Sequence, residues 1–370
     1  MKFCIFNPDN DLALANGTPD YCAPQEIVVM QNDLWEMPEW WYNEEILPYK
    51  PNHEYSTREI NMISSVDSWG WNLKLRKTLL GIGISSDIIP DENYIDYLRE
   101  LSHRRSSILL LIALSKDLNY KNKLPEIPKE IFTLHDGIDF LFNNPDSLFK
   151  TPWSSSGKGI FWCSKMNKHE LELRLEASLN KYGSIIAEKR FNKIQDFAML
   201  FESEGNGNIL FKGYSLFNAD DKGAYISNTL LSDEKIKSKL TEYVDIEQLN
   251  ILEEILLKHL ADLIGIYKGS IGIDMMIYEQ DGLFMIHPCI EINFRKTMGR
   301  VARDFFDNFC SKDKDGSFHV SYKKEGIKSI LDELLRLNPL VIKDGLIDKG
   351  FTAITSYNEN TKFCIYAIIN

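Results

Sequence analysis

Cysteine is scarce in this chain, and the few cysteines are not spaced for metal or disulfide chemistry. The six cysteines are scattered over 370 residues, and no two of them form a CxxC pair. A structural zinc site needs closely spaced Cys and His ligands, and a disulfide framework needs many paired cysteines in a short chain. We therefore expect neither, and the pattern is typical of a reducing compartment.

Long hydrophobic runs and an excess of positive charge are also missing. The longest apolar run, residues 108–114, is far shorter than the ~20 residues that span a bilayer. The first residues predict a buried strand, without a basic segment and a long apolar stretch, so we expect no signal peptide and a cytoplasmic protein. The net charge of -12 disfavours nucleic-acid binding through bulk electrostatics. Neither nucleic acid nor a membrane is an expected partner.

The composition that is present is that of an ordinary globular protein, with 44% hydrophobic and 26% charged residues. A chain of 370 residues is too long for one compact core, so we expect several domains of mixed α/β and α+β structure. The pattern predicts a strand over residues 2–7 and a loop over the Asn-, Asp-, Gly- and Pro-rich residues 8–21. Helices are predicted over residues 68–80, 93–101 (after an Asp91 cap), 107–118, 168–181, 232–264 and 297–309.

Residues 269–295 form the most informative segment, because two alternating stretches flank a tight-turn dipeptide. Asp281-Gly282 tolerates positive φ and predicts a two-residue hairpin turn. The expected pairs all join apolar residues: Ile271 with Ile292, Ile273 with Ile290, and Ile277 with Ile286. Pro288 cannot donate to a partner strand, so it marks an edge strand or a bulge, and a bulge would change this register.

The other face of the hairpin is polar and carries Asp274, Cys289, Glu291 and Asn293. In the expected register Asp274 lies opposite Cys289 and diagonal to Glu291, about 7–8 Å apart at the backbone. Two carboxylates and an amide oxygen at that reach can hold hard cations such as Mg²⁺. The alternative is the solvated polar face of an antiparallel sheet.

A second informative segment, FKTPWSSSGKGIFWC at residues 149–163, predicts a strand, a small-residue loop and another strand. The backbone N–H groups around Ser156, Gly157 and Gly159 can approach an anion closely, and Lys158 can add a positive charge. Lys150, on the preceding strand, can reach a phosphate or a ring nitrogen. The GxxxxGK[ST] spacing of a P-loop is absent. The alternative is a flexible hairpin loop with an ordinary surface lysine.

Three further features carry weaker signals. Glu188 ends one strand and Asp196 opens the next, where a nucleotide base and ribose can be bound, although a lone Glu at a strand end is usually solvated. Four polar residues follow the first strand, where open α/β sheets bind ligands, although a loop with Asx turns explains them equally well: Asn7, Asp9, Asn10 and Asp11. The aromatic segment 35–42 either covers a cleft or, more often, packs on the body of its domain.

The order of these features resembles the ATP-grasp superfamily over roughly residues 103–310. The chain has a lysine before a GKG loop, a strand ending in AEKRF, an acidic residue shortly after, a long helix, an Asp-bearing strand and the EINFR motif. The resemblance implies that Lys150 and Lys158 contact nucleotide phosphates, together with Ser156, Gly157 and Gly159. It also implies the remaining roles: Glu188 as the adenine contact, Lys189 to Phe191 as the hinge, Asp196 as the ribose contact, Lys212 as a further phosphate contact, Asp274, Glu291 and Asn293 as Mg²⁺ ligands, and Arg295 as the arginine that steadies an acyl phosphate.

The resemblance implies ATP and Mg²⁺ as cofactors and an ADP-forming ligase that joins a small-molecule carboxylate to an amine through an acyl phosphate. Arg295 and Lys158 would be the catalytic residues, and the substrates would be amino-acid-like or peptide-like. A small-molecule kinase and a non-catalytic nucleotide-binding protein remain alternatives.

The implied domains are a pre-ATP-grasp-like, Rossmann-like unit (1–102), a small lid subdomain (103–190), a large subdomain with the Mg²⁺ site (191–310) and an extension with a helix and a β-hairpin (311–370). The extension is either an extra sheet on the body or a contact in a homodimer.

Overall fold

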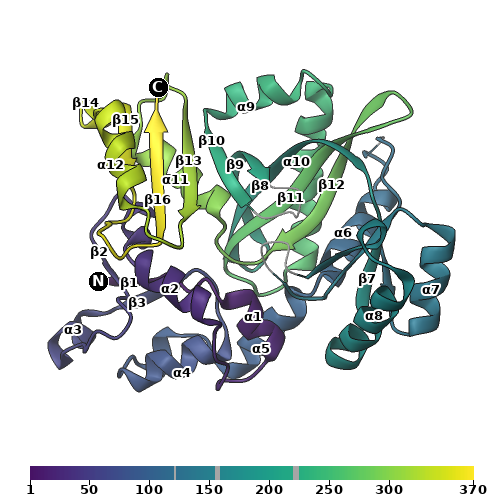
Figure 1. The fold of residues 1–370 in the computed structure, drawn as a ribbon, viewed down its shortest axis with the longest axis horizontal. Coiled ribbons are helices and arrows are strands. Elements are labelled where there is room, and N and C mark those ends of the chain that lie inside the picture. The colour runs from purple at the N-terminus through teal and green to yellow at the C-terminus, as the bar shows by residue number, and fades with distance from the viewer. Residues whose placement is uncertain (121, 155–158, 220–224) are drawn as a thin grey trace.

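The computed structural model describes residues 1–120, 122–154, 159–219 and 225–370. Figure 1 shows three sheets: an N-terminal sheet, a large central sheet, and a small sheet beside α7 and α8 at the opposite side from the N-terminus. None of the described helices has both the length and the hydrophobicity to cross a membrane. The polar and apolar faces of these sheets create the site described below.

The N-terminal unit is built on a parallel sheet with strand order β2-β1-β3. Its strands are β1 (Lys2–Ile5), β2 (Ile46–Pro48) and β3 (Ser65–Ser68), and Phe3, Cys4 and Ile5 of the central strand are fully buried. Around them lie α1 (Asn10–Asn16), α2 (Gln25–Asp33), the short helix η1 (Met37–Trp40), α3 (Thr57–Met62) and α4 (Leu73–Gly81). The parallel strands agree with the expected Rossmann-like character of this unit.

Two helices lead from this unit into the rest of the chain. After the short helix η2 (Ser86–Ile88), α5 (Glu92–Leu101) begins at Asp91, whose side chain accepts a hydrogen bond from the Tyr94 amide. This N-cap confirms the sequence prediction. Helix α6 (Arg105–Lys116) follows after a short turn and packs against β12 and α10.

The small sheet is antiparallel, with strand order β4-β7-β5-β6. Its strands are β4 (Lys129–Ile131), β5 (Ser147–Lys150), β6 (Ile160–Trp162) and β7 (Ile185–Lys189). One face is covered by α7 (Leu134–Asn143) and α8 (Lys168–Tyr182), and the short helix η3 (Cys163–Lys165) links β6 to α8. All residues of β5 are buried, which fixes the position of Lys150 at its end.

The large sheet has nine strands in the order β12-β11-β8-β9-β10-β13-β16-β15-β14. The first five strands in this order are β12 (Leu283–Asn293), β11 (Gly269–Gln280), β8 (Asn192–Gly205), β9 (Asn208–Ala219) and β10 (Tyr225–Leu230). Helices α9 (Asp233–Leu240) and α10 (Ile246–Leu263) supply much of the core on one face. Helix α11 (Met298–Phe309) follows the hairpin and packs beside β9 and β10.

The C-terminal segment extends the same large sheet. It contributes β13 (Gly316–Tyr322), β14 (Val341–Lys343), β15 (Leu346–Ala353) and β16 (Phe363–Ile369), with α12 (Lys328–Leu337) against β15. Strand β13 pairs with β10 of the preceding segment, so one sheet contains strands from both sides of the predicted domain boundary at residue 310. The expected hairpin is present, but its strands extend the large sheet, so the interpretation as an extra sheet is wrong. The boundary at 310 and the homodimer stay predictions.

Several local predictions were wrong, and in each case tertiary contacts decided the structure. Residues 10–16, predicted as loop, form α1. The helix predicted at 68–80 begins only at Leu73, because β3 ends at Ser68 and a short connection follows. The helical region predicted at 232–264 is two helices, α9 and α10. The aromatic segment packs on the body, as the commoner interpretation predicted: Trp41 is buried against Trp69, and Trp40 contacts Phe305 and Phe309.

Candidate functional site

A bulge in the β11–β12 hairpin decides which side chains face one another. Asp281 and Gly282 have φ values of 56° and 76°, which confirms the predicted tight turn. Ile277 pairs with Ile286 as expected, but the register shifts between Asp274 and Met276. Beyond the shift Ile273 pairs with Ile292 and Asp274 pairs with Glu291.

The bulge lies at Pro288, which has no N–H to donate to β11. The predicted pairs Asp274–Cys289, Ile273–Ile290 and Ile271–Ile292 are therefore wrong. Within the bulge two side chains change sides: Cys289 is 1% exposed within the main hydrophobic core, and Ile290 lines a cleft. Asp274 and Glu291 are consequently direct cross-strand neighbours, closer than the diagonal arrangement expected from the sequence.

The three predicted metal ligands form one cluster on this hairpin. The Asn293 amide nitrogen donates to Asp274 Oδ2 at 3.0 Å, which leaves the amide oxygen available. Burial, and next the nearby Glu291 carboxylate, raise the pKa of Asp274 to about 7. Two carboxylates and an amide oxygen are the donors that Mg²⁺ accepts, and a cation here would relieve the excess negative charge. Within the described ranges no group of three or more His, Cys, Asp or Glu could hold a metal, so further ligands would come from water or phosphate oxygens.

Arg104 lines the cleft beside the predicted metal ligands, and it was not among the site residues predicted from the sequence. Its guanidinium Nη2 donates to both oxygens of Glu291 at 3.0 Å, while Nη1 donates to the Thr151 carbonyl at 2.5 Å and to Ser154 Oγ at 2.9 Å. Its side chain is only 5% exposed. Arg104 therefore ties the predicted metal carboxylate to the start of the small-residue loop. Lying in a run of basic residues, it had no sequence signal that separated it from a surface charge.

Lys150 and Glu188 form a buried ion pair between neighbouring strands of the small sheet. Lys150 Nζ lies 2.5 Å from Glu188 Oε1, and the side chains are 5% and 12% exposed. The pairing of β5 with β7 places both residues on one face of the sheet. Lys150, the predicted phosphate contact, and Glu188, the predicted adenine contact, are thus bound to each other in this structure.

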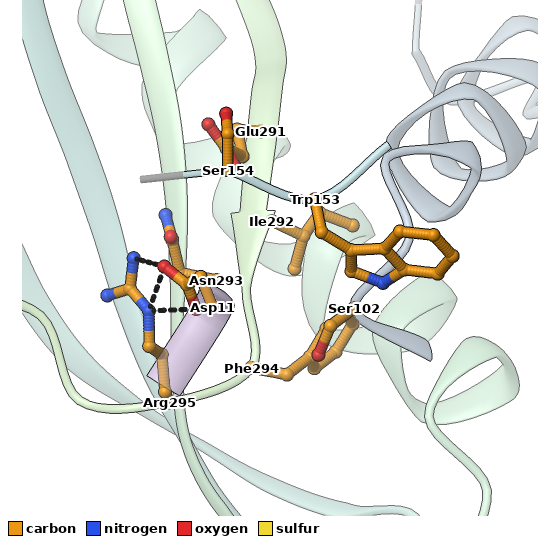
Figure 2. A pocket seen from close by; sticks show the side chains of 9 residues that line it. All are labelled: Asp11, Ser102, Trp153, Ser154, Glu291, Ile292, Asn293, Phe294 and Arg295. Atoms are coloured by element: carbon orange, nitrogen blue, oxygen red, sulfur yellow. Dashed lines mark hydrogen bonds and ion pairs between the residues drawn. The ribbon is translucent and has the colours of Figure 1, made fainter. Parts of the chain in front are cut away.

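Arg295 is held by a carboxylate from the N-terminal unit. Its Nε and Nη2 atoms donate to Asp11 at 2.8–3.0 Å, and Nη1 donates to the Lys296 carbonyl at 2.9 Å. Figure 2 shows this pair beside Asn293, with Glu291 and Ser154 next to each other on the other side. Helix α1 therefore brings a residue 284 positions away in the sequence to the end of the EINFR motif.

Of the four polar candidates after the first strand, Asp11 alone lines the cleft among the described residues. The others have structural partners: Asn7 bonds the Gly70 carbonyl, Asp9 bonds Lys74, and Asn10 accepts from Asn72. These partners lie 62–65 residues away in the sequence, so long-range contacts, and not the Asx turns of a loop, hold those three side chains.

These groups surround one cleft with a volume of about 550 Å³. One end is lined by Lys150, Ile160 and Asp196, the middle by Arg104 and the three predicted metal ligands, and the other end by Asp11, Arg295 and residues of α2, β13 and β16. Two lysines (Lys150 and Lys193), two arginines (Arg104 and Arg295) and the carboxylates of the predicted metal site line the same cleft. This arrangement suits a polyphosphate with a bound cation.

No protein-family model matches the sequence, and no curated protein matches it. Solved structures match over the whole chain. The chain is similar to N5-carboxyaminoimidazole synthetase from Staphylococcus aureus complexed with ADP, with 12% identity, a TM-score of 0.51 and 93% of that chain covered. It is also similar to the biotin carboxylase domain of Hydrogenobacter thermophilus 2-oxoglutarate carboxylase complexed with MgADP, ADP and bicarbonate, with 10% identity, a TM-score of 0.51 and 86% covered. A third similar structure is the biotin carboxylase complex with β-γ-ATP from Campylobacter jejuni, with 10% identity, a TM-score of 0.52 and 87% of that chain covered. All three matches cover 100% of this chain.

The chain has the ATP-grasp fold. The small sheet with α7 and α8 and the large sheet with the β11–β12 hairpin are the two parts that give this fold its cleft, and the parallel N-terminal sheet precedes them (Figure 1). The predicted fold class is confirmed.

The structure places the remaining predicted site residues differently with respect to the cleft. Asp196 lines the cleft and accepts a bond from Lys193 at 2.6 Å. The ring of Phe191 packs against Tyr278 and the buried His287, with centroids 4.7 and 5.5 Å apart, so the predicted hinge segment contacts the large sheet. Lys189 is half exposed and pairs with Glu126.

Lys212 is not brought to the cleft. It is exposed at the bulge between the Leu200–Gly213 and Phe201–Phe211 pairs, and the cleft-lining residues of its strand are Ser215, Phe217 and Ala219. A bulge turns a side chain out of the alternation, which sequence spacing does not reveal.

Ser156, Gly157 and Lys158 lie outside the described residues. Gly159 is described and buried where the two arms of the loop meet: its carbonyl accepts from the Thr151 amide at 2.9 Å. A Cβ at Gly159 would lie 2.2 Å from Thr151 Oγ1 and 2.6 Å from Ser154 Cβ, so this close approach requires glycine.

Proposed function

We propose that the protein is an ADP-forming ligase that activates a carboxylate with Mg-ATP and transfers the acyl group to an amine. The observation that carries the proposal is the convergence of Arg104, Lys150, Asp274, Glu291 and Arg295 on one cleft between the two sheets. The matched proteins were solved with ADP, MgADP or an ATP analogue, which supports a nucleotide in this cleft. The low sequence identities leave the substrates to experiment.

The triphosphate would lie along the basic end and middle of the cleft. Lys150 and Arg104 are each paired with a carboxylate here, at 2.5 Å and 3.0 Å, so bound phosphate oxygens would replace Glu188 and Glu291 as their anionic partners. Glu291 would then be free to join Asp274 and Asn293 around a cation. Bound Mg²⁺ would neutralise charge on the transferring phosphoryl group.

The reaction needs no protein nucleophile. A carboxylate oxygen of the substrate attacks the γ-phosphorus, the bond to the β-phosphate oxygen breaks, and ADP leaves. The neutral amine then attacks the carbonyl carbon of the acyl phosphate; a C–N bond forms, the C–O bond to phosphate breaks, and inorganic phosphate and one proton of the amine leave. Arg295 lies next to Asn293 and can stabilise the negative oxygen at this centre.

Trapping with hydroxylamine tests the proposal. The full chain is incubated with Mg-ATP, hydroxylamine and a panel of amino acids and dipeptides, and ADP and hydroxamate are measured together. A ligase forms one hydroxamate per ADP with at least one carboxylate. ADP with a stable phosphorylated alcohol and no hydroxamate would identify a kinase. Nucleotide binding without ADP release over the panel would identify a non-catalytic nucleotide-binding protein.

A further inference from the structure

The bulge in β12 leaves a short piece of backbone that β11 does not hold. The pairs on its two sides are Met276–His287 and Asp274–Glu291, so residues 288–290 have no partner of their own on β11. Strand β12 is also an edge of the large sheet, and its outward N–H groups face no neighbouring strand. A contact from another element therefore has to fix the backbone where the strand resumes its pairing at Glu291.

Ser107, in the first turn of α6, makes this contact. It is 6% exposed, and its Oγ accepts a hydrogen bond from the Ile292 amide at 3.1 Å. The Cys289 thiol, inside the bulge, lies close to the same hydroxyl. The Ile292 amide belongs to the planar peptide unit that directly follows Glu291, so its orientation affects the direction of the side chains on both sides. The bond thus holds the backbone between Glu291 and Asn293, two of the three predicted metal ligands.

The same turn of the chain also holds the Glu291 side chain, but through a different kind of bond. Arg104, directly before α6, donates to both Glu291 oxygens at 3.0 Å. In the proposed function a cation replaces Arg104 at these oxygens. The Ser107 bond goes to the backbone and is not affected by that exchange. Ser107 can therefore keep the ligands in place while Arg104 changes its partner.

We infer that Ser107 is a positioning residue for the metal site: its hydroxyl holds the Glu291–Ile292 peptide so that the Glu291 and Asn293 side chains face Asp274. The inference rests on the proposed function for the presence of Mg²⁺ and adds a residue on which the metal affinity depends. An alanine at this position would leave the buried Ile292 amide without its acceptor and would free the peptide to turn.

Nucleotide affinity with and without Mg²⁺ tests the inference on the full chain. A fluorescent, non-hydrolysable ATP analogue is titrated in EDTA and at saturating Mg²⁺, and the ratio of the two dissociation constants measures the contribution of the metal ligands. We expect the wild type to bind more than about 10-fold more tightly with Mg²⁺, which separates the carboxylates from the phosphates. Ser107→Ala should reduce this ratio about 10-fold and leave the affinity in EDTA unchanged, because the hydroxyl acts on the metal ligands alone.

Two variants separate this role from a general loss of stability. Ser107→Thr keeps the hydroxyl and should retain the wild-type ratio. Ser203→Ala removes a matched buried hydroxyl, which is 1% exposed, accepts from the Gly205 amide at 3.2 Å and lies outside the cleft lining, and it should also retain the ratio. An unchanged ratio in Ser107→Ala would overturn the inference, and so would an equal fall in Ser107→Ala and either of the other two variants.

A variant of similar size serves if Ser107→Ala does not fold. Ser107→Cys keeps the volume of the side chain but offers a weak acceptor, so its ratio should fall as well. An unaltered ratio in Ser107→Cys then contradicts the inference.

The outcomes distinguish this inference from the proposed function. Equal wild-type affinities in EDTA and in Mg²⁺ would remove the metal site, and the inference with it. A wild-type Mg²⁺ effect that persists in Ser107→Ala would remove the inference alone. Failure of the hydroxamate test would remove the proposed reaction, whereas the affinity ratios would still measure the role of Ser107.

Discussion

At the residue scale, the Glu291 carboxylate has two possible partners. In this structure both oxygens accept from Arg104 at 3.0 Å, while Asp274 faces Glu291 across the strand pair. In the proposed function a cation binds both carboxylates, and Arg104 turns to a phosphate. This exchange of partners is driven by electrostatics, because Arg104 and a divalent cation compete for the same Glu291 oxygens.

Glu291→Gln should lower Mg-dependent ATP turnover by about 100-fold or more, because an amide keeps one acceptor for Arg104 but loses the charge that binds a cation. ADP release at saturating ATP and a range of Mg²⁺ concentrations measures this. Glu279→Gln, on the same hairpin but outside the cleft lining, removes a partly exposed carboxylate that accepts from Asn192 and should retain wild-type turnover. Full activity of Glu291→Gln would remove the metal assignment.

Asp274 also predicts a pH dependence of stability in the absence of metal. Burial and the neighbouring Glu291 raise its folded-state pKa from 3.8 to about 7, so the folded protein binds more protons than the unfolded chain between those values. Its contribution to stability is therefore fully present below pH 4 and is lost as the pH rises toward 7.

Asp274→Asn removes this titration. In EDTA, we expect its melting temperature to rise relative to wild type as the pH goes from 4 to 8, by several degrees at the upper end. Thermal unfolding at pH 4.5, 6 and 8 measures the difference. A constant difference over this range would show that the wild-type carboxyl titrates at its ordinary pKa.

At the element scale, the paired strands β5 and β6 hold the residues on either side of the loop close together. The Thr151 amide bonds the Gly159 carbonyl, and the Thr151 carbonyl bonds Arg104, so one short segment connects the loop to the metal cluster. Lys150, at the end of β5, is positioned by the same contacts.

Gly159→Ala should weaken nucleotide binding about 10-fold, because the added methyl group would overlap Thr151 and Ser154 and displace the segment that Arg104 bonds. Titration of a fluorescent ATP analogue measures the affinity. Gly81→Ala is the matched control, since a Cβ there meets no atom within 4 Å, and it should leave the affinity unchanged. Equal affinities of the two variants would show that the loop tolerates the overlap.

The hairpin illustrates what sequence patterns predict at this scale. The turn at Asp281-Gly282 and the pair Ile277–Ile286 follow from local alternation and are confirmed. The partner of Asp274 depends on the bulge at Pro288. The alternation of apolar and polar residues did not predict how many residues the bulge contains. Strand patterns report neighbours along the chain, whereas register beyond a bulge depends on how the whole face packs.

At the scale of the whole molecule, the N-terminal unit is joined to the large sheet around a buried lysine. Lys296 Nζ lies 3.0 Å from Asp67 Oδ2, and the same carboxylate oxygen accepts from the Tyr42 hydroxyl at 2.6 Å. The Lys296 amide also donates to the Trp69 carbonyl at 2.8 Å. These contacts follow directly after Arg295, so the docking of the N-terminal unit also positions the site.

Asp67→Asn should destabilise the protein by about 3 kcal/mol, because the lysine, 9% exposed, loses its counter-charge. Equilibrium unfolding in urea measures the change. Asp96→Asn, at an exposed position of α5, should change the free energy of unfolding by less than about 0.5 kcal/mol. A similar small effect of Asp67→Asn would show that Lys296 is solvated without its partner.

The sequence by itself determined the local features of this protein: a tight turn at Asp281-Gly282, the Asp91 cap of α5, and the order of motifs that predicted an ATP-grasp fold. Each depends on residues close together in the chain, where φ preferences, capping bonds and alternation act directly. The tertiary structure alone decided that Arg104 binds Glu291 and that Asp11 binds Arg295. These partners are 187 and 284 residues apart, and only the packing of separate sheets brings their charges within bonding distance.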